Sequence, residues 1–371
     1  SKILNSNIHT RITRIGTSVP ENEYLQADLA KWMHQRLDAK DERMERVFRA
    51  LYQKTKIEKR HSVLPDFYEN CQYPSLFTNS ASEPKVEERL AIYNRTALPL
   101  AEKAANTCLK DYDRNKITHL ITVSCTGMSA PGLEIQLKQK LQLKHNTQTH
   151  AVNFVGCYAF FPALKMADAF VRSDPKANVL IVAVELCTLH FQNKDSDDHL
   201  LSNSLFSDGA AACLCSAEPG DKTTFKLTGT DQLLIPKGES NMAWNIHSEG
   251  FLMKLSNYIP QLVDEGIKQL IESLLQPTGM LQKDIAHWAI HPGGRKILEV
   301  CEEELQLVTN ELRASHATLK NYGNMSAPTI IFVLEEMLKT ETLRSGEKLF
   351  TCGFGPGLTL EAALFEIENN A

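Results

Sequence analysis

Three short segments of the chain each present one side chain of a type used in acyl transfer. They are Val155-Gly156-Cys157-Tyr158, His291-Pro292-Gly293-Gly294 and Gly323-Asn324-Met325-Ser326. A cysteine thiolate attacks thioesters, an imidazole exchanges a proton with it, and a carboxamide donates a hydrogen bond to a developing oxyanion. Together these side chains predict covalent catalysis on a thioester.

Cys157 is the candidate nucleophile. It follows an apolar strand predicted over 150–155 and precedes a predicted helix. Backbone N–H groups at a helix start stabilise an anion, so a thiol at this position should ionise more easily. A free cysteine is more often a small buried hydrophobe. The two matching polar sites elsewhere in the chain favour the catalytic interpretation here.

The other two candidates each have a competing interpretation. His291 ends an apolar strand over 285–290, and the glycines after it let the backbone approach a ligand closely. His287, four residues upstream, is its nearest competitor. Asn324 precedes an apolar helix predicted over 324–339, where it would serve equally well as an N-cap. Because its amide can also donate to an oxyanion, capping and catalysis both stay open.

The bulk composition is that of a soluble globular protein. The 371 residues are 43% hydrophobic and 23% charged, with a net charge of −5. This charge gives no attraction to nucleic acid or to an anionic membrane, and no apolar run has the length of a membrane span. The nine cysteines have no metal-ligand spacing, so we expect no metal site. The first residues do not resemble a signal peptide, so we expect these cysteines to be reduced thiols in a cytoplasmic protein.

The order of elements predicts an α/β fold. After a mainly helical first hundred residues, apolar strands alternate with helices, which indicates central sheets covered by helices. The polar linker at 216–221 divides the chain into halves over 1–217 and 218–371, and each half places a catalytic-type residue after a strand. Two related halves predict a five-layer arrangement. The expected strands lie at 117–124, 150–155, 178–185, 210–215, 225–231, 285–290, 349–353 and 358–365.

The motifs resemble those of one known family. Gly-Cys, His-Pro-Gly-Gly and Gly-Asn-Met-Ser, followed by Gly353-Phe354-Gly355-Pro356-Gly357, occur in this order in the type III polyketide synthases, the chalcone synthase-like family. The resemblance covers the chain from about Ile117 onward. It implies a thiolase-like αβαβα fold, a homodimer, and an acyltransferase that condenses malonyl-CoA onto an acyl-CoA starter and cyclises the product to a pyrone or phenol. The CoA thioesters are substrates, so no cofactor is implied.

The resemblance also implies roles for individual residues. Cys157 would hold the starter and the growing chain. His291 would form an ion pair with Cys157 and, with Asn324, stabilise the enolate formed when malonyl-CoA loses CO₂. Phe206 matches a gatekeeper between the CoA tunnel and the cavity, although core packing would also explain it. Lys54 on a basic helix would contact CoA phosphates, and a solvated helix face is the alternative.

Further positions match the family's substrate-binding residues. Ala130 matches a residue that reaches into the partner's cavity and is usually Met, and Met253 matches a second gatekeeper that is usually Phe. Trp244 aligns with a position that is Gly in roomier members. These differences from the plant members argue against a plant-type flavonoid product for this chain. The full set of predicted substrate-binding residues is Lys54, Cys125, Thr126, Ala130, Cys187, Leu189, Met253, Gly293, Ser326 and Phe354.

Three other protein classes share part of this pattern. A ketoacyl-carrier-protein synthase III uses the same Cys, His and Asn but usually carries His-Gln-Ala-Asn where this chain has His-Pro-Gly-Gly. A papain-type hydrolase has a different signature around its cysteine. A non-catalytic partner subunit would be expected to lose one of the three residues. The sequence therefore predicts a decarboxylative condensing enzyme, with the synthase III type as the alternative.

Overall fold

The computed structural model describes residues 8–37, 41–78, 82–256, 259–308 and 310–370. Within these residues, nine strands form one mixed sheet in the order β11-β12-β13-β8-β1-β7-β6-β4-β5. A short antiparallel contact between β1 and β8 joins the two parts of this sheet. The strands are β1 (Arg11–Ser18), β4 (His119–Ser124), β5 (Gln148–Asn153), β6 (Asn178–Leu186), β7 (Asp208–Ser216), β8 (Thr224–Leu234), β11 (Ile285–Ile290), β12 (Lys348–Gly355) and β13 (Thr359–Glu368).

The two parts of the sheet repeat one topology. The first part runs β1-β7-β6-β4, and the second runs β8-β13-β12-β11. In both parts the first two pairings are antiparallel and the third is parallel. This match of order and direction indicates an internal duplication, to which the first half adds the edge strand β5. The division predicted at 217/218 falls between β7 and β8 and stays a prediction.

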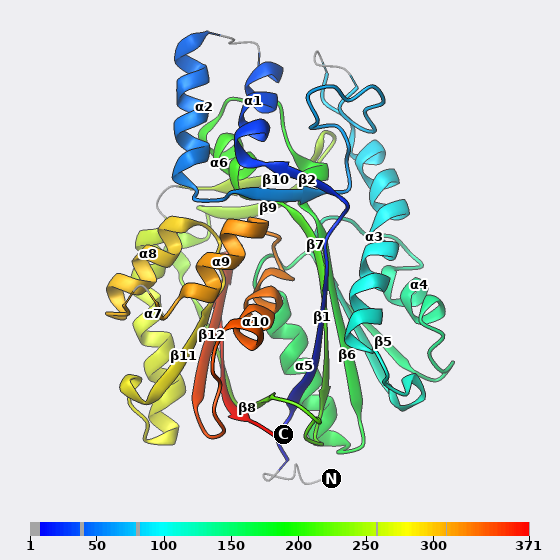
Figure 1. Ribbon diagram of the computed structural model, residues 1–371, viewed down its shortest axis with the longest axis vertical. Helices are drawn as coiled ribbons and strands as arrows, with labels where there is room; N and C mark the ends of the chain where they lie inside the picture. The colour runs from blue at the N-terminus through cyan, green and yellow to red at the C-terminus, as the bar shows by residue number, and fades with distance from the viewer. Residues whose placement is uncertain (1–7, 38–40, 79–81, 257–258, 309, 371) are drawn as a thin grey trace.

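Two helices lie between the two parts of the sheet (Figure 1). α5 (Phe160–Ser173) contacts β4, β6 and β7 on one side and β13 on the other, while α10 (Thr329–Thr340) contacts β1, β7 and β11. The first six residues of α10 are all buried, as expected for a helix that is apolar on every side. These contacts place α5 and α10 in the central layer.

Further helices cover the outer faces and complete the five layers. α3 (Val86–Cys108), with α4 (Leu133–Lys140), covers β1, β6 and β7. α7 (Ile259–Leu275) covers β8 and β13, α8 (Arg295–Glu304) lies beside α7, and α9 (Arg313–Tyr322) contacts α8 and α10. The predicted thiolase-like αβαβα fold is therefore confirmed. In the described part of the chain no helix has both the length and the apolar character to cross a bilayer.

Shorter elements gather at one end of the sheet, at the top of Figure 1. They are α1 (Gln26–Arg36), α2 (Glu42–Lys54), α6 (Asp197–Leu205), the hairpin of β2 (Asn22–Leu25) with β3 (Lys59–Ser62), and the hairpin of β9 (Met242–His247) with β10 (Gly250–Leu255). The prediction of a mainly helical first hundred residues is right for α1 to α3. It is wrong for β1, which mixes charged and apolar residues and is fixed as a strand by β7 and β8.

Candidate active site

Cys157 lies in the turn that connects β5 to α5. Gly156 before it has a φ of +112°, and a Cβ at that position would lie 2.3 Å from Cδ of Pro356, so the turn requires glycine. Cys157 is only 3% exposed. The side chains of Ser326 and Asn324 lie near its thiol and act to lower the thiol's pKa. The predicted position of Cys157 between a strand and a helix is correct.

Asn324 lies five residues before α10 and does not cap it. Its backbone N–H donates to the carbonyl of Leu205 at 2.9 Å, in a short bridge beside Phe206. Its side-chain Nδ2 donates to the carbonyl of Gly293 at 3.2 Å, and its Oδ1 accepts from the N–H of Ser326 at 2.8 Å. The helix-capping interpretation of Asn324 is therefore wrong, and these bonds fix its carboxamide.

His291 follows the last residue of β11, and its backbone N–H donates to the carbonyl of Cys352 at 2.9 Å. Gly293, whose carbonyl accepts from Asn324, also lies beside the imidazole of His291. A Cβ placed on Gly293 would lie 3.6 Å from Cδ2 of that ring. Both ring nitrogens of His291 are buried, and neither has a hydrogen-bond partner among the described residues. Because unpaired buried polar groups are rare, these nitrogens are candidates for contact with a ligand.

His287, the competitor of His291, belongs to a separate cluster. Its Nδ1 lies 3.1 Å from Glu341, and its Nε2 lies 2.6 Å from Glu347. Burial lowers the pKa of His287, but its hydrogen bonds to the two carboxylates outweigh burial and raise the pKa above its usual value. This side chain ties β11 to the end of α10 and to the turn before β12, and it takes no part in the site.

We expect His287→Gln to weaken the fold in a pH-dependent way. Since the folded-state pKa lies above the unfolded value of about 6.5, protonated His287 contributes stability that is fully present below about pH 6.5 and is lost as the pH rises through the folded pKa. Urea unfolding should give a difference between parent and variant that is larger near pH 6 than near pH 9, both values being rough marks on either side of that transition. Exposed His145→Gln is the control, and a pH-independent difference would contradict the ion-pair assignment.

Burial opposes ionisation of both Cys157 and His291. It raises the pKa of the Cys157 thiol to about 11, although hydrogen bonds from Ser326 and Asn324 act in the opposite direction. Burial also lowers the pKa of His291 to about 3. The neutral thiol and the neutral imidazole are therefore favoured in this conformation. A thiolate–imidazolium pair requires direct contact of the two groups, because their attraction must exceed both burial costs.

A cavity opens beside Cys157, with a volume of about 570 Å³ that includes the solvent at its mouth. Its walls come from both halves of the chain and are mostly apolar. Among the residues that the sequence predicts for the site, Cys125, Thr126, Cys157, Cys187, Phe206, Met253 and Ser326 line it. Trp244 lines it too, and pairs directly with Met253 across the β9–β10 hairpin. The cavity therefore has a nucleophile, polar groups near it, and an enclosing apolar wall.

Two family models together match almost the whole chain. Residues 3–219 match the N-terminal domain of chalcone and stilbene synthases, and residues 226–367 match their C-terminal domain. The chain belongs to the chalcone and stilbene synthase family. It is a chalcone synthase-like type III polyketide synthase, an enzyme of the acyltransferase type. The family predicted from the sequence is confirmed, and the papain-type interpretation is wrong.

Solved structures of polyketide synthases have the same fold. PKS-I from the brown alga Ectocarpus siliculosus superposes with a TM-score of 0.90 at 24% identity, covering 98% of this chain and 99% of that one. The C-terminal type III polyketide synthase domain of Steely1, a type I/III hybrid from Dictyostelium, gives a TM-score of 0.89 at 25% identity, covering 98% and 100%. The synthase is thus similar to both along its length.

Five predicted substrate-binding residues of the synthase do not line the cavity. Leu189 and Phe354 are buried in the core, and Gly293 lies between Asn324 and His291. Ala130 is exposed in the segment before α4, and Lys54 is exposed at the end of α2. Leu189, Phe354 and Gly293 could therefore influence a substrate in the cavity only from behind the wall. Ala130 and Lys54 could act only at the surface or on a partner.

Glu185 is a cavity residue that the sequence reasoning missed. It lies near the end of the apolar strand β6, is fully buried, and accepts a hydrogen bond from the backbone N–H of Cys125 at 2.6 Å. Burial raises the pKa of this carboxyl group well above its usual value, although the hydrogen bond from the Cys125 N–H acts in the opposite direction. The available signal was a single acidic residue near the end of an otherwise apolar strand, a position that needs a partner or a function.

Cys125 supports the turn that carries the nucleophile. Its sulfur accepts the backbone N–H groups of Val155 at 3.2 Å and Gly156 at 3.1 Å. Burial raises the pKa of Cys125, and also that of Cys187, well above the usual value for a thiol. Both therefore stay protonated at neutral pH, whereas at Cys157 the side chains of Ser326 and Asn324 counteract burial.

Proposed function

We propose that the synthase extends an acyl-CoA starter, carried on Cys157, with malonyl-CoA units and cyclises the chain to a pyrone- or phenol-type product. The observation that carries the proposal is the Cys157 thiol on the cavity wall, with the side chains of Asn324 and Ser326 near it. A thioester bound there would place its carbonyl next to a nucleophile and a fixed amide donor. Malonyl-CoA and the acyl-CoA starter are proposed as substrates, without a cofactor.

The proposed chemistry balances with these groups alone. The sulfur of Cys157 attacks the starter carbonyl, and CoA leaves as its thiol with the cysteine proton. Malonyl-CoA then loses CO₂, and the enolate oxygen receives hydrogen bonds from Asn324 and His291. The enolate carbon attacks the Cys157 thioester, forms a carbon–carbon bond and releases the sulfur. Where a bound substrate displaces water from the mostly apolar cavity, the two donors would act more strongly on the enolate than in solvent.

Residues on the cavity wall are proposed to shape the apolar part of the reaction site. Phe206 is fixed by its own backbone, whose carbonyl accepts from Arg60 at 2.7 Å. Trp244 donates from its indole nitrogen to the carbonyl of Cys125 at 2.7 Å, which holds the ring in place. We assign to Phe206 and Met253 the apolar surface at which CO₂ is lost. Cys125, Thr126, Cys187 and Ser326 would contact the growing chain.

The proposal is tested by incubating the purified synthase with malonyl-CoA and a panel of acyl-CoA starters. Mass spectrometry should detect products that have gained two or more acetate units, with release of CO₂ and CoA. A parallel reaction with malonyl-acyl carrier protein tests the synthase III alternative, which predicts a single condensation and dependence on the carrier protein. Failure to extend any starter from malonyl-CoA would refute the proposed function.

Lys54 is proposed to contact a CoA phosphate at the cavity mouth. It ends α2, which contacts α6, and α6 contributes Ser202 and Asn203 to the cavity wall. Within the described residues Lys54 forms no ion pair, whereas Arg46 and Arg49 on the same helix pair with glutamates one turn away. Of the four cations on α2, only Arg43 and Lys54 have no ion pair among the described residues, and Lys54 is the one at the C-terminal end of the helix.

We expect Lys54→Ala to raise the KM for acyl-CoA about 3- to 10-fold without lowering kcat, the effect of losing roughly 1 kcal/mol of exposed charge attraction. The KM increase should shrink at high salt, because screening weakens the parent's contact. Lys103→Ala on the exposed side of α3 is the control. A KM unchanged at low salt would remove Lys54 from the CoA site.

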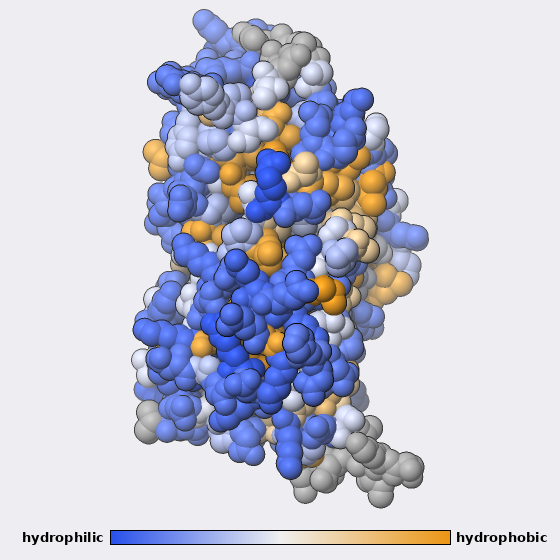
Figure 2. All heavy atoms as spheres, turned by 90° about the vertical axis from the view of Figure 1, so that its right-hand side faces the viewer, coloured by the Kyte–Doolittle hydropathy of each residue, from blue (hydrophilic) through white to orange (hydrophobic). Residues whose placement is uncertain are grey.

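The homodimer also belongs to the proposal. β5 is an edge strand of the sheet, and the face that carries α3 and α4 exposes apolar side chains among polar ones (Figure 2). Met128 and Ile135 are exposed before and within α4, close in sequence to Ala130, which would reach the partner. Light scattering should therefore give twice the chain mass of 41.6 kDa. A monomer at micromolar concentration would contradict the dimer.

A further inference from the structure

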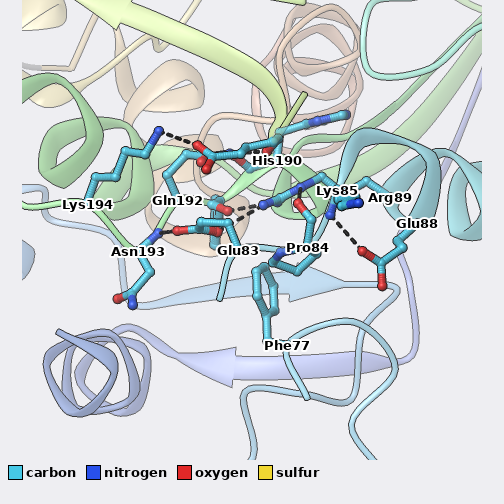
Figure 3. A network of polar contacts seen from close by, with 12 residues as sticks. Phe77, Glu83, Pro84, Lys85, Glu88, Arg89, His190, Gln192, Asn193 and Lys194 are labelled. Carbon is cyan, nitrogen blue, oxygen red and sulfur yellow. Dashed lines mark hydrogen bonds and ion pairs between the residues drawn. The ribbon is translucent and has the colours of Figure 1, made fainter. Parts of the chain in front are cut away.

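A buried arginine lies behind one wall of the cavity. Arg89, near the start of α3, is 0% exposed, and its guanidinium donates in three directions (Figure 3). Nε donates to the carbonyl of Pro84 at 3.1 Å, and Nη1 donates to the carbonyls of Leu189 at 2.6 Å and Phe191 at 2.8 Å. One planar group thus holds the backbone on both sides of His190.

Glu83 links the guanidinium of Arg89 to Asn193, at the end of the segment 189–193. Its Oε2 lies 3.0 Å from Nη2 of Arg89, and its Oε1 accepts the backbone N–H of Asn193. In Figure 3 the carboxylate lies between the guanidinium and Asn193. Burial lowers the pKa of Arg89 to about 10, so the group is still charged at neutral pH. The ion pair therefore fixes residues 189–193 at three backbone positions.

The fixed segment is a wall of the catalytic cavity. His190, Phe191 and Gln192 line the cavity, while Arg89 and Glu83 do not. Between the two gripped carbonyls, the His190 ring bonds to the carbonyl of Thr126 at 2.6 Å through Nε2 and accepts the N–H of Phe251 at 3.0 Å through Nδ1. A displacement of the backbone at residues 189–191 would therefore move an aromatic side chain into or out of the cavity.

The adjoining wall of the cavity packs against the same arginine. A Cβ placed on Gly250 would lie 2.8 Å from Cδ of Arg89, so the start of β10 packs directly against this side chain. The β9–β10 hairpin carries Trp244 and Met253 into the cavity. The His190 ring also meets Trp244 edge-on, with centroids 5.5 Å apart. Arg89 thus lies at the junction of two cavity walls.

We propose that Arg89, held by Glu83, is a positioning residue that sets the distance between the 189–193 wall and the β9–β10 hairpin, and thereby the number of malonyl units the cavity accepts. The inference rests on the proposed function. A lysine cannot replace Arg89, because one ammonium group cannot meet three carbonyls and a carboxylate in the planar geometry that a guanidinium presents. The conservative exchange Arg89→Lys keeps the charge and removes the fork.

The experiment compares parent, R89K and E83Q with R95K, an exposed arginine on the same helix. Each is supplied with one starter and malonyl-CoA, and three quantities are measured: the product-length distribution, the rate of malonyl-CoA decarboxylation, and hydrogen exchange in peptides that cover 187–193. In R89K and E83Q we expect the ratio of products that differ by one extension to shift at least ~3-fold, decarboxylation to change less than about 2-fold, and exchange in 187–193 to accelerate. R95K should match the parent in all three.

The outcomes separate the inference from the proposed function. A parent that extends no starter refutes the function itself, and with it the inference. If the parent makes polyketide and folded R89K or E83Q gives the same product lengths, the inference alone is overturned. An equal loss of decarboxylation and extension in the variants also overturns it. If R89K does not fold by circular dichroism, E83Q decides, since its amide oxygen can still accept from Asn193 while the charge beside Arg89 is removed.

Discussion

Replacing Cys157 with alanine should abolish both the acyl-enzyme and chain extension. The thiol is the group that would hold the starter, and the side chains of Ser326 and Asn324 lie near it and act to lower its pKa. We expect no substitution by the other cavity cysteines, because the sulfur of Cys125 already accepts two backbone N–H groups and burial also raises the pKa of both Cys125 and Cys187. Intact-protein mass spectrometry after incubation with an acyl-CoA should show the acyl mass on the parent and none on the variant.

Cys71 provides the matched control for this experiment. All nine cysteines lie in the described part of the chain, and Cys71 is the one among them that is not buried, so a non-specific thioester exchange would occur there first. Cys71→Ala should keep the adduct and the product yield of the parent, and peptide mapping should place the adduct on the peptide that contains Cys157. Extension that persists in Cys157→Ala would contradict the nucleophile assignment, whatever the adduct pattern.

The positions of the cysteine and the histidine were predictable because their signals are local. Each follows a run short enough to be a strand, largely apolar before His291 and of mixed polarity before Cys157, and each has glycine close by, which permits a tight turn. The positive φ of Gly156 and its closeness to Pro356 are the physical reason for the glycine before Cys157. A short strand followed by a glycine-containing turn is thus enough to predict that a side chain lies just beyond the end of the strand.

The setting of Asn324 was not predictable, since long-range contacts override the local pattern there. The apolar residues after Asn324 continue the periodicity of α10, which extends the predicted helix to residue 324. In the structure Ser326 adopts a φ of 59°, and the backbone of Asn324 pairs with Leu205, far away along the chain. These two features shorten the helix at its start and free the carboxamide to approach Cys157.

The composition of the cavity depends on elements that the sequence did not reveal. The β9–β10 hairpin has no strong turn signal, yet its register places Trp244 opposite Met253, so both enter the cavity together. Glu185 and His190 are acidic and basic residues in buried segments, and only their partners in other elements show why they are tolerated. The family was legible from motifs, whereas the shape of the cavity required the packing.

The second large effect should come from the two proposed enolate donors. His291→Gln and Asn324→Ala should each slow malonyl-CoA decarboxylation by ~10²-fold or more, the usual loss for one oxyanion donor. Asn324→Asp is the sharper variant. An aspartate keeps an oxygen to accept the Ser326 N–H and removes the Nδ2 donor, so a loss equal to that of alanine assigns the effect to the donor. Released CO₂ is measured without a starter.

His291 has an additional readout through the reactivity of Cys157. Burial holds the pKa of the thiol at about 11, so alkylation by iodoacetamide at neutral pH requires contact with the imidazole. If that contact forms in solution, His291→Gln should move the midpoint of alkylation to higher pH. His316→Gln, whose ring pairs with Glu302 on the surface, is the control and should leave both alkylation and decarboxylation as in the parent.

These two measurements separate enolate stabilisation from thiolate activation. A variant that decarboxylates slowly but alkylates normally has lost an enolate donor only, which is the result expected for Asn324→Asp. His291→Gln should lose both, because its two ring nitrogens, unpartnered among the described residues, are the groups available to the sulfur and to the enolate oxygen in turn. Unchanged CO₂ release in both His291→Gln and Asn324→Ala would remove the two residues from the site, because a group that stabilises the enolate must affect the rate at which the enolate forms.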